Sequence, residues 1–324
     1  MTKFIGRQAD VGIAKEASRG TAETSATFYL PKLSVSLDDK IDQAIDESSV
    51  GVIEDSPNAA IVAKMAEGQI EGNIYDKSFG LLLLGTLGSV ATTGPAESTV
   101  YTHAFSVLQS AQHPSLTFFL EDPNQDYKYA LGMLTSLDID IALGQFAKYS
   151  ANFRSKVGAT ATLTPSYTTE NFFLPQHGSL KTATNLAGLG AASVIDVRSV
   201  KLSIAKNVDD DRKLGSVDPT DILNKQVAVE GSIEIVYNDT SFKTDMLADT
   251  AKAWRIRLSN TDVTIGSTKN PQLTIDLAKV KITSYEKQYS NDDVTVATVS
   301  FKAYYSTADS AMMTMELINT QSSY

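Results

Sequence analysis

Hydrophobic and polar residues alternate along much of this chain with the period of two that β-strands show. The alternation is clear at residues 33–38, 69–75 and 116–120. Two longer stretches, 137–154 and 273–305, are each typical of an antiparallel hairpin with one apolar and one polar face. The pattern therefore predicts a mainly β protein.

Two short helices and two acidic connections are expected between these strands. Phe79–Leu87 forms an apolar run preceded by the capping residues Asp76 and Ser78, and a second helix is expected at 241–248. Residues 38–66 and the segment around 209–221 are acidic and are expected to be long connections. Connections of this length are uncommon in compact domains and often functional.

The second half of the chain repeats the order of elements in the first half. Each half has a strand, a long acidic connection, a strand, a short helix, a strand and a long hairpin. The matched positions are Leu33 with Val200, Glu71-Gly72 with Glu230-Gly231, Phe79 with Phe242, and Phe153-Arg154 with Phe301-Lys302. An order repeated over six elements predicts a duplicated domain.

The repeat divides the chain into four segments. Residues 1–28 are expected to be an extended N-terminal arm, 29–160 the first domain copy, 161–192 a linker and 193–324 the second copy. The expected fold is two similar β-sandwich or barrel domains, each with a short helix. Because 1–28 and 38–66 lack a core-forming pattern, we expect them to be disordered in an isolated subunit and ordered after assembly.

Composition and charge exclude several classes of protein. The chain of 324 residues has no cysteine, which rules out disulfides, thiolate metal sites and cysteine nucleophiles. Its formal net charge is −10 and no basic stripe occurs, so binding to nucleic acid is not expected. The most apolar run, 79–88, is about half the length that crosses a bilayer, and residues 1–20 do not resemble a signal peptide. We expect a soluble protein made in the cytoplasm.

No catalytic or metal-binding motif is found. The three histidines, His103, His113 and His177, have no zinc-hydrolase spacing, and neither a Gly-x-Ser-x-Gly elbow nor a Walker loop occurs. Asp209–Asp211 lacks the glycine and glutamate of a calcium-binding loop. We therefore expect no enzyme activity, no cofactor and no metal site.

Several short motifs carry a resemblance to a known family. They are Gly6-Arg-Gln8, Val11–Glu16, Arg19-Gly-Thr21, and the Glu-Gly-x-Ile pattern that precedes Phe79–Leu87. With them the chain resembles the tail tube proteins of long-tailed bacteriophages, over nearly its whole length and most clearly at 6–90. The resemblance implies a mobile N-terminal arm, a β-sandwich, and a virion protein that polymerises into stacked rings. It also implies that the inner sheets form a barrel around a lumen for DNA.

The resemblance also implies partners and a place of action. The implied partners are further copies of the chain, the tape measure protein, the tail terminator and the baseplate or tail-tip proteins, with DNA in transit only and no membrane. The place of action is the virion tail, assembled in the host cytoplasm. A duplicated tube domain resembles the flexible, non-contractile type of tail.

Two consequences combine the repeat with the resemblance. Three chains with two domains each would give a trimeric ring with pseudo-sixfold symmetry; the alternative is a hexamer of whole chains. Asp138 and Asp140 lie on the polar face of a long hairpin and are the candidate lumen-facing residues, with Lys279 and Lys281 near the same place in the second copy. An acidic lumen would keep DNA from adhering.

Other classes of protein stay open at this point. One is another β-sandwich virion protein, such as a head–tail connector or a decoration protein. A second is a carbohydrate-binding adhesin module, which would display clustered exposed aromatic residues. A third is an enzyme built on a β scaffold.

Overall fold

The fold is described from a computed structural model, which describes residues 3–97, 99–289, 291 and 294–324. The first half contains β1 (Asp10–Lys15), β2 (Phe28–Leu30), β3 (Lys32–Asp46), β4 (Asn58–Asn73), α1 (Phe79–Leu87), β5 (Gly88–Thr93), β6 (Tyr101–Val107), β7 (Leu116–Glu121), β8 (Tyr127–Ala142), β9 (Lys148–Ser155) and β10 (Ala159–Thr160). The second half contains β11 (Gly178–Ala183), β12 (Val194–Ile195), β13 (Ser199–Asp211), β14 (Asp221–Val236), α2 (Ser241–Leu247), β15 (Lys252–Ser259), β16 (Gln272–Gln288), β17 (Val296–Tyr304) and β18 (Met313–Asn319). Three short 3₁₀ turns lie at Gly6–Gln8, Pro175–His177 and Leu186–Gly190. The expected mainly β, sandwich-type fold is confirmed.

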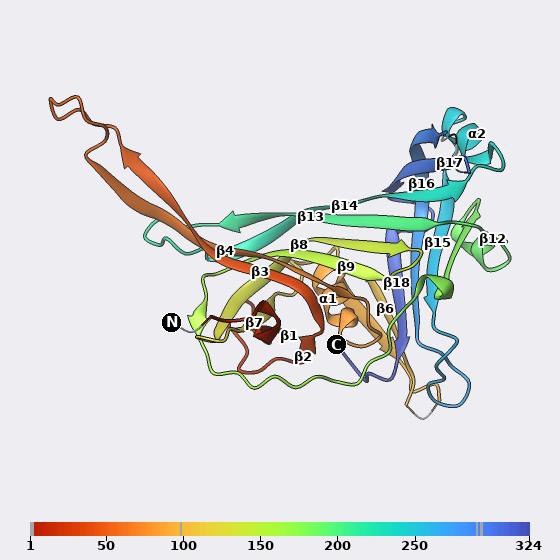
Figure 1. The fold of residues 1–324 in the computed structure, drawn as a ribbon, viewed down its shortest axis with the longest axis horizontal. Helices are drawn as coiled ribbons and strands as arrows, with labels where there is room; N and C mark the ends of the chain where they lie inside the picture. Colours follow the sequence, from red (N-terminus) through yellow and green to blue (C-terminus); the bar gives the residue numbers. More distant parts are fainter. Residues whose placement is uncertain (1–2, 98, 290, 292–293) are drawn as a thin grey trace.

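The strands of the two halves pair in the same order. In the first half the order is β2–β1–β7–β8–β9–β4–β3, and in the second it is β12–β11–β15–β16–β17–β14–β13. Every neighbouring pair is antiparallel. β8 also pairs with β13, from Ala142 opposite Ser199 to Ser136 opposite Ala205. This junction produces one continuous run, β3–β4–β9–β8–β13–β14–β17–β16, which we call the long sheet (Figure 1).

A glycine beneath an aromatic ring fixes how the two halves align. Gly68 on β4 lies opposite Phe153 on β9, and Gly231 on β14 lies opposite Phe301 on β17. A Cβ atom added at either glycine would come 2.5 Å from the Cζ atom of its phenylalanine. The expected match of Glu71-Gly72 with Glu230-Gly231 is therefore shifted by four residues. An alternating pattern looks the same after any even shift, and β4 contains Glu-Gly twice.

Irregularities in the pairing repeat at the same positions. β8 and β9 change register between Leu134 and Ser136, and β16 and β17 change register between Ile282 and Ser284. Similar shifts occur in β3–β4 and β13–β14, and in β7–β8 and β15–β16. This alignment matches Asp138 with Glu286. Lys279 and Lys281, expected near the place of Asp138 and Asp140, instead match Leu131 and Met133.

The helix α1 packs behind the long sheet, whereas α2 lies at the edge of the molecule with most of its residues exposed. All nine residues of α1 are buried, as expected for a helix that is apolar on every side. It ends at Gly88, whose φ of 90° is left-handed and whose N–H donates to Leu84 O. Phe242, the buried residue of α2, packs against Trp254, which packs against Phe301.

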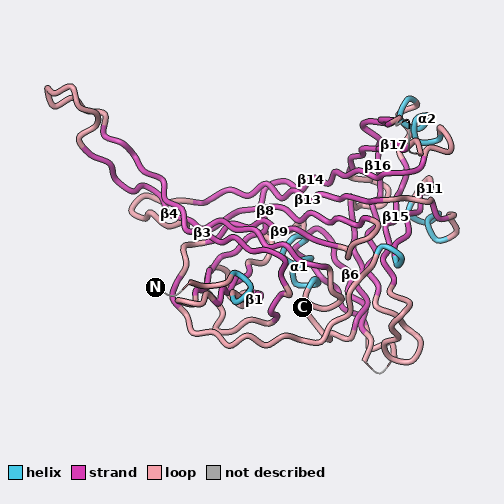
Figure 2. The backbone as a smooth tube through the Cα atoms, in the orientation of Figure 1, coloured by secondary structure: helices cyan, strands magenta, loops and turns pink. Residues whose placement is uncertain are grey.

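Two segments expected to lack regular structure are strands. β1 pairs with β2 and β7 and buries Val11 and Ile13, so this part of the expected arm belongs to the core. Residues 38–66 form most of the hairpin β3–β4, which extends to the pair Asp46–Asn58. The turn at 47–57 projects far from the rest of the molecule (Figure 2). Beyond residue 37 β3 is exposed, so its sequence shows no apolar side and resembles a connection.

The second acidic segment is also the end of a hairpin. β13 and β14 pair as far as Asp211 and Asp221, leaving only 212–220 as a turn. β18 then pairs with both β16 and β6. The last strand of the chain therefore connects the second half to the β5–β6 hairpin of the first half.

Candidate functional site

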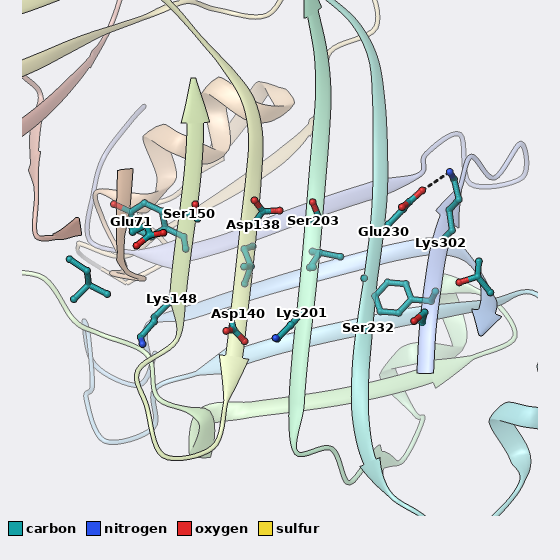
Figure 3. A pocket seen from close by; sticks show the side chains of 18 residues that line it. Glu71, Asp138, Asp140, Lys148, Ser150, Lys201, Ser203, Glu230, Ser232 and Lys302 are labelled. Carbon is teal, nitrogen blue, oxygen red and sulfur yellow. Dashed lines mark hydrogen bonds and ion pairs between the residues drawn. The ribbon is translucent and has the colours of Figure 1, made fainter. Parts of the chain in front are cut away.

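The long sheet presents one polar face along its whole width. On β8, Leu137 and Ile139 point into the core, so Ser136, Asp138 and Asp140 point away from it. The same alternation on β9, β13, β14 and β17 places their polar side chains on that side. These side chains surround a hollow of about 970 Å³, seen from close by in Figure 3. We call this surface the polar face.

Carboxylates outnumber cations on the polar face. The carboxylates are Asp38, Glu67, Glu71, Asp138, Asp140, Glu230, Glu234 and Glu286, and the cations are Lys40, Lys148, Arg154, Lys201 and Lys302. Lys281 is neutralised by Asp249, whose Oδ2 lies 2.6 Å from its Nζ. The polar face therefore carries a net negative charge, although several of its charged side chains form ion pairs.

The two candidate residues from the sequence lie side by side here, in different surroundings. Asp140 lies opposite Lys148 on β9 and opposite Lys201 on β13, and Figure 3 shows it between the two lysines. Asp138 lies opposite two serines, Ser150 and Ser203. Asp138 thus has no cation directly opposite it, whereas Asp140 has one opposite it on each neighbouring strand.

One ion pair recurs at equivalent places in the two halves. Arg154 on β9 binds Glu67 on β4, and Lys302 on β17 binds Glu230 on β14 with an Nζ–Oε1 distance of 2.6 Å. Both cations follow the phenylalanine that covers a glycine. Sequence reasoning did not pair these residues, because an alternating pattern does not determine which residues of two strands lie opposite each other. The repeated Glu-Gly and Phe-Arg or Phe-Lys dipeptides were the available signal.

The histidines lie away from the polar face and serve structural roles. The Nε2 atom of His103 lies 3.1 Å from Asn319 Oδ1, and that of His177 lies 3.1 Å from Asp262 Oδ2. Burial, helped by the charge of Lys206, lowers the pKa of His113 to about 4. Within the described residues no group of acidic side chains and histidines is placed to hold a metal ion. In the same part of the chain, no helix has the length and hydrophobicity to span a bilayer.

A sheet that ends in strand edges without partners is typical of subunits that associate edge to edge. The sequence profile of the family described as phage tail tube protein matches residues 6–303, and the chain therefore belongs to that family. No curated protein matches the chain in sequence. The chain is accordingly a structural component of a phage tail that assembles into a tube with other tail proteins, and the resemblance found in its motifs is confirmed.

Proposed function

We propose that the polar face lines the lumen of a tube made from stacked rings of this chain, and that DNA passes along it. The observation that carries the proposal is the long sheet itself, which has one polar, acidic face and two outer edges with no partner strand in the part of the chain that the structure describes. An acidic surface repels the phosphates of DNA in transit, so the cargo does not adhere at each ring.

We propose further that the chain carries two copies of one tube domain. The shared pairing order and the matched register shifts support this. In this proposal β1 to β10 form the first copy and β11 to β18 the second. The segments expected as arm and linker then supply the first strand of each copy. Three chains would give six domains, and hence a trimeric ring with pseudo-sixfold symmetry.

The projecting hairpin β3–β4 is the proposed contact between rings. Its turn carries exposed apolar side chains, Val50, Val52 and Ile53, the last of them fully exposed. Apolar side chains gathered on a surface mark sites of protein contact. Docked on the adjacent ring, this turn would bury them and hold successive rings in register.

The remaining partners in the proposal follow from the tube. The tape measure protein would occupy the lumen before DNA, and the tail terminator and the baseplate or tail-tip proteins would bind the two ends of the tube. Assembly would take place in the host cytoplasm, in a tail of the non-contractile type, and without enzymatic activity.

Negative-stain microscopy of the purified chain tests the proposal directly. The expected images show rings or tubes with a central channel. Discrete globules at all concentrations and salt conditions would contradict the tube and would favour a decoration protein or an adhesin module.

A further inference from the structure

The long sheet ends in two strand edges that have no partner strand among the described residues. At one end, β3 pairs only with β4, so its other edge is open. At the other end, β16 pairs with β17 through Gln288, but its pairing with β15 stops at Val280. Among the described residues, no strand pairs with the side of 284–288 that faces away from β17. Open edges of this length bind another strand readily.

The internal junction shows what these edges are built to bind. β8 is the counterpart of β16, and β13 is the counterpart of β3. Inside the chain, the edge of β8 at 136–142 binds the edge of β13 at 199–205. The matched register shifts place 284–289 at the position of 136–141, and 35–40 at the position of 200–205. The two open edges are therefore equivalent to the two that already meet.

We infer that β16 of one copy pairs antiparallel with β3 of the next copy, in the register of the internal β8–β13 junction. This inference rests on the proposed function, because it names the strands that close the ring. The described pairs are then Ser284 with Lys40, Tyr285 with Asp39, Glu286 with Asp38, Lys287 with Leu37, Gln288 with Ser36, and Tyr289 with Val35.

The pairing continues both faces of the long sheet across the junction. Glu286 and Asp38 meet on the polar face, with Lys40 one position further along on the same side. The aliphatic part of Lys287 covers Leu37 on the opposite face, where Leu37 already packs partly against the core. A slip by one residue would turn these faces around, so the alternation of faces excludes odd-numbered slips, and the repeat selects one register among the rest.

Engineered disulfides test the register, since the chain has no cysteine of its own. Residues directly opposite each other on antiparallel strands have Cα atoms about 4.5–5.5 Å apart, which suits a disulfide. The first test variant carries Gln288→Cys with Ser36→Cys, and the second carries Ser284→Cys with Lys40→Cys. In each variant the two sites lie at opposite ends of the long sheet, so a bond between them joins separate chains.

The expected result is covalent linkage of assembled protein after mild oxidation, seen as a ladder on a non-reducing gel and reversed by a thiol. The matched control carries Ser284→Cys with Asp39→Cys, a one-residue slip whose side chains point to opposite faces; it should stay largely unlinked. Circular dichroism verifies that each variant is folded.

The outcomes separate this inference from the proposed function. If the parent protein forms rings but both test variants stay unlinked, or if the control links as well as they do, the register is wrong and the tube stands. If the parent protein forms no ring, both the proposed function and this inference are overturned.

Discussion

At the scale of single residues, the glycines beneath Phe153 and Phe301 are sites of close packing at equivalent places in the two halves of the long sheet. A Cβ atom at Gly231 would also lie 2.4 Å from Lys201 O, and one at Gly68 would lie 2.7 Å from Ser36 O. Both neighbours are backbone oxygen atoms held in the sheet, so neither can move aside as the free end of a flexible side chain could. Only glycine lets the neighbouring strand and the phenylalanine side chain approach the backbone this closely.

We therefore predict that Gly68→Ala and Gly231→Ala each destabilise the subunit, by about 1–3 kcal/mol, because the added methyl group overpacks the site. Urea unfolding of the unassembled subunit measures the change. Gly190→Ala is the matched control, since nothing lies within 4 Å of a Cβ atom added there. A loss no larger than that of the control would contradict the assigned packing.

A buried lysine connects the second half of the molecule to α1. Lys206 is fully buried on β13, and its Nζ atom donates a hydrogen bond of 2.7 Å to Gly85 O. Burial, followed by the nearby charge of Arg19, lowers the pKa of Lys206 from 10.5 to about 7. The folded subunit thus releases this proton at a much lower pH than the unfolded chain.

The sign of the resulting pH dependence is determined by proton binding. Between about pH 7 and 10 the unfolded state holds the Lys206 proton and the folded state does not. The free energy of unfolding should therefore rise with pH, by up to about 1.4 kcal/mol per unit from this group. In Lys206→Met this rise should vanish, while Lys225→Met, at an exposed site on β14, serves as the control. If the free energies of unfolding of the wild type and Lys206→Met, measured with urea, change with pH in the same way from pH 7 to 9.5, the assignment is refuted.

Some of these residue environments could be predicted from sequence and others could not. The alternation around Asp138 and Asp140 correctly places both on a polar face, because side chains of neighbouring residues on a strand point to opposite sides. It does not show which of the two carboxylates lies opposite cations. That difference depends on Lys148 and Lys201, which lie opposite Asp140 on two other strands, one of them 61 positions away in the sequence.

At the scale of elements, the hairpin β3–β4 is where the sequence pattern fails. Its outer half has no buried face, so the apolar alternation that identifies strands is missing from residues 39–46. Backbone pairing with β4 holds this part of the hairpin together. The opposite case is β1, whose apolar residues are nearly contiguous because the strand is buried. Both segments resemble unstructured polypeptide unless their partner strands are known.

These two segments should respond differently to deletion. Replacing 47–57 with an Asn-Gly turn should leave thermal unfolding within a few degrees of the wild type, because the turn contributes little to the core. The shortened protein should form rings that no longer stack. Deleting 1–28 removes β1 with Val11 and Ile13 and should unfold the first half instead. Circular dichroism and negative-stain microscopy distinguish the two results, and normal tubes from the shortened hairpin would exclude a stacking role.

At the scale of the whole molecule, the long sheet gives the proposed lumen a net negative charge, and lysine substitutions can reverse that charge at chosen positions. Asp138 and its counterpart Glu286 occupy equivalent places on the polar face. We predict that assembled Asp138→Lys, Glu286→Lys tubes retain short duplex DNA at low salt and release it as salt rises, because phosphate binding depends on counterion release. Wild-type tubes should not retain DNA in a sedimentation assay. Asp196→Lys, beyond β12 and away from the polar face, should behave as the wild type; equal retention by it would show that the polar face is not the DNA path.

The number of chains in a ring follows from the internal junction. Since β8 and β13 already join the two halves of one chain, each chain would contribute two adjacent segments of the wall in the proposed tube. If β16 and β3 join chains in the same geometry, every domain boundary around the ring bends the sheet by a similar amount, whether it lies within a chain or between chains. A wall of six domains then closes with three chains rather than six.

We therefore predict that a single ring contains three copies of the 34.9 kDa chain. Image averages viewed along the tube axis should show six similar lobes that alternate in detail, because the two halves differ in side chains and only the first carries the β5–β6 hairpin. The disulfide-linked variants provide an independent count, since fully oxidised rings should end as a covalent trimer. Six chains in a ring, or a second half lying outside the wall, would contradict the duplication while leaving the family assignment intact.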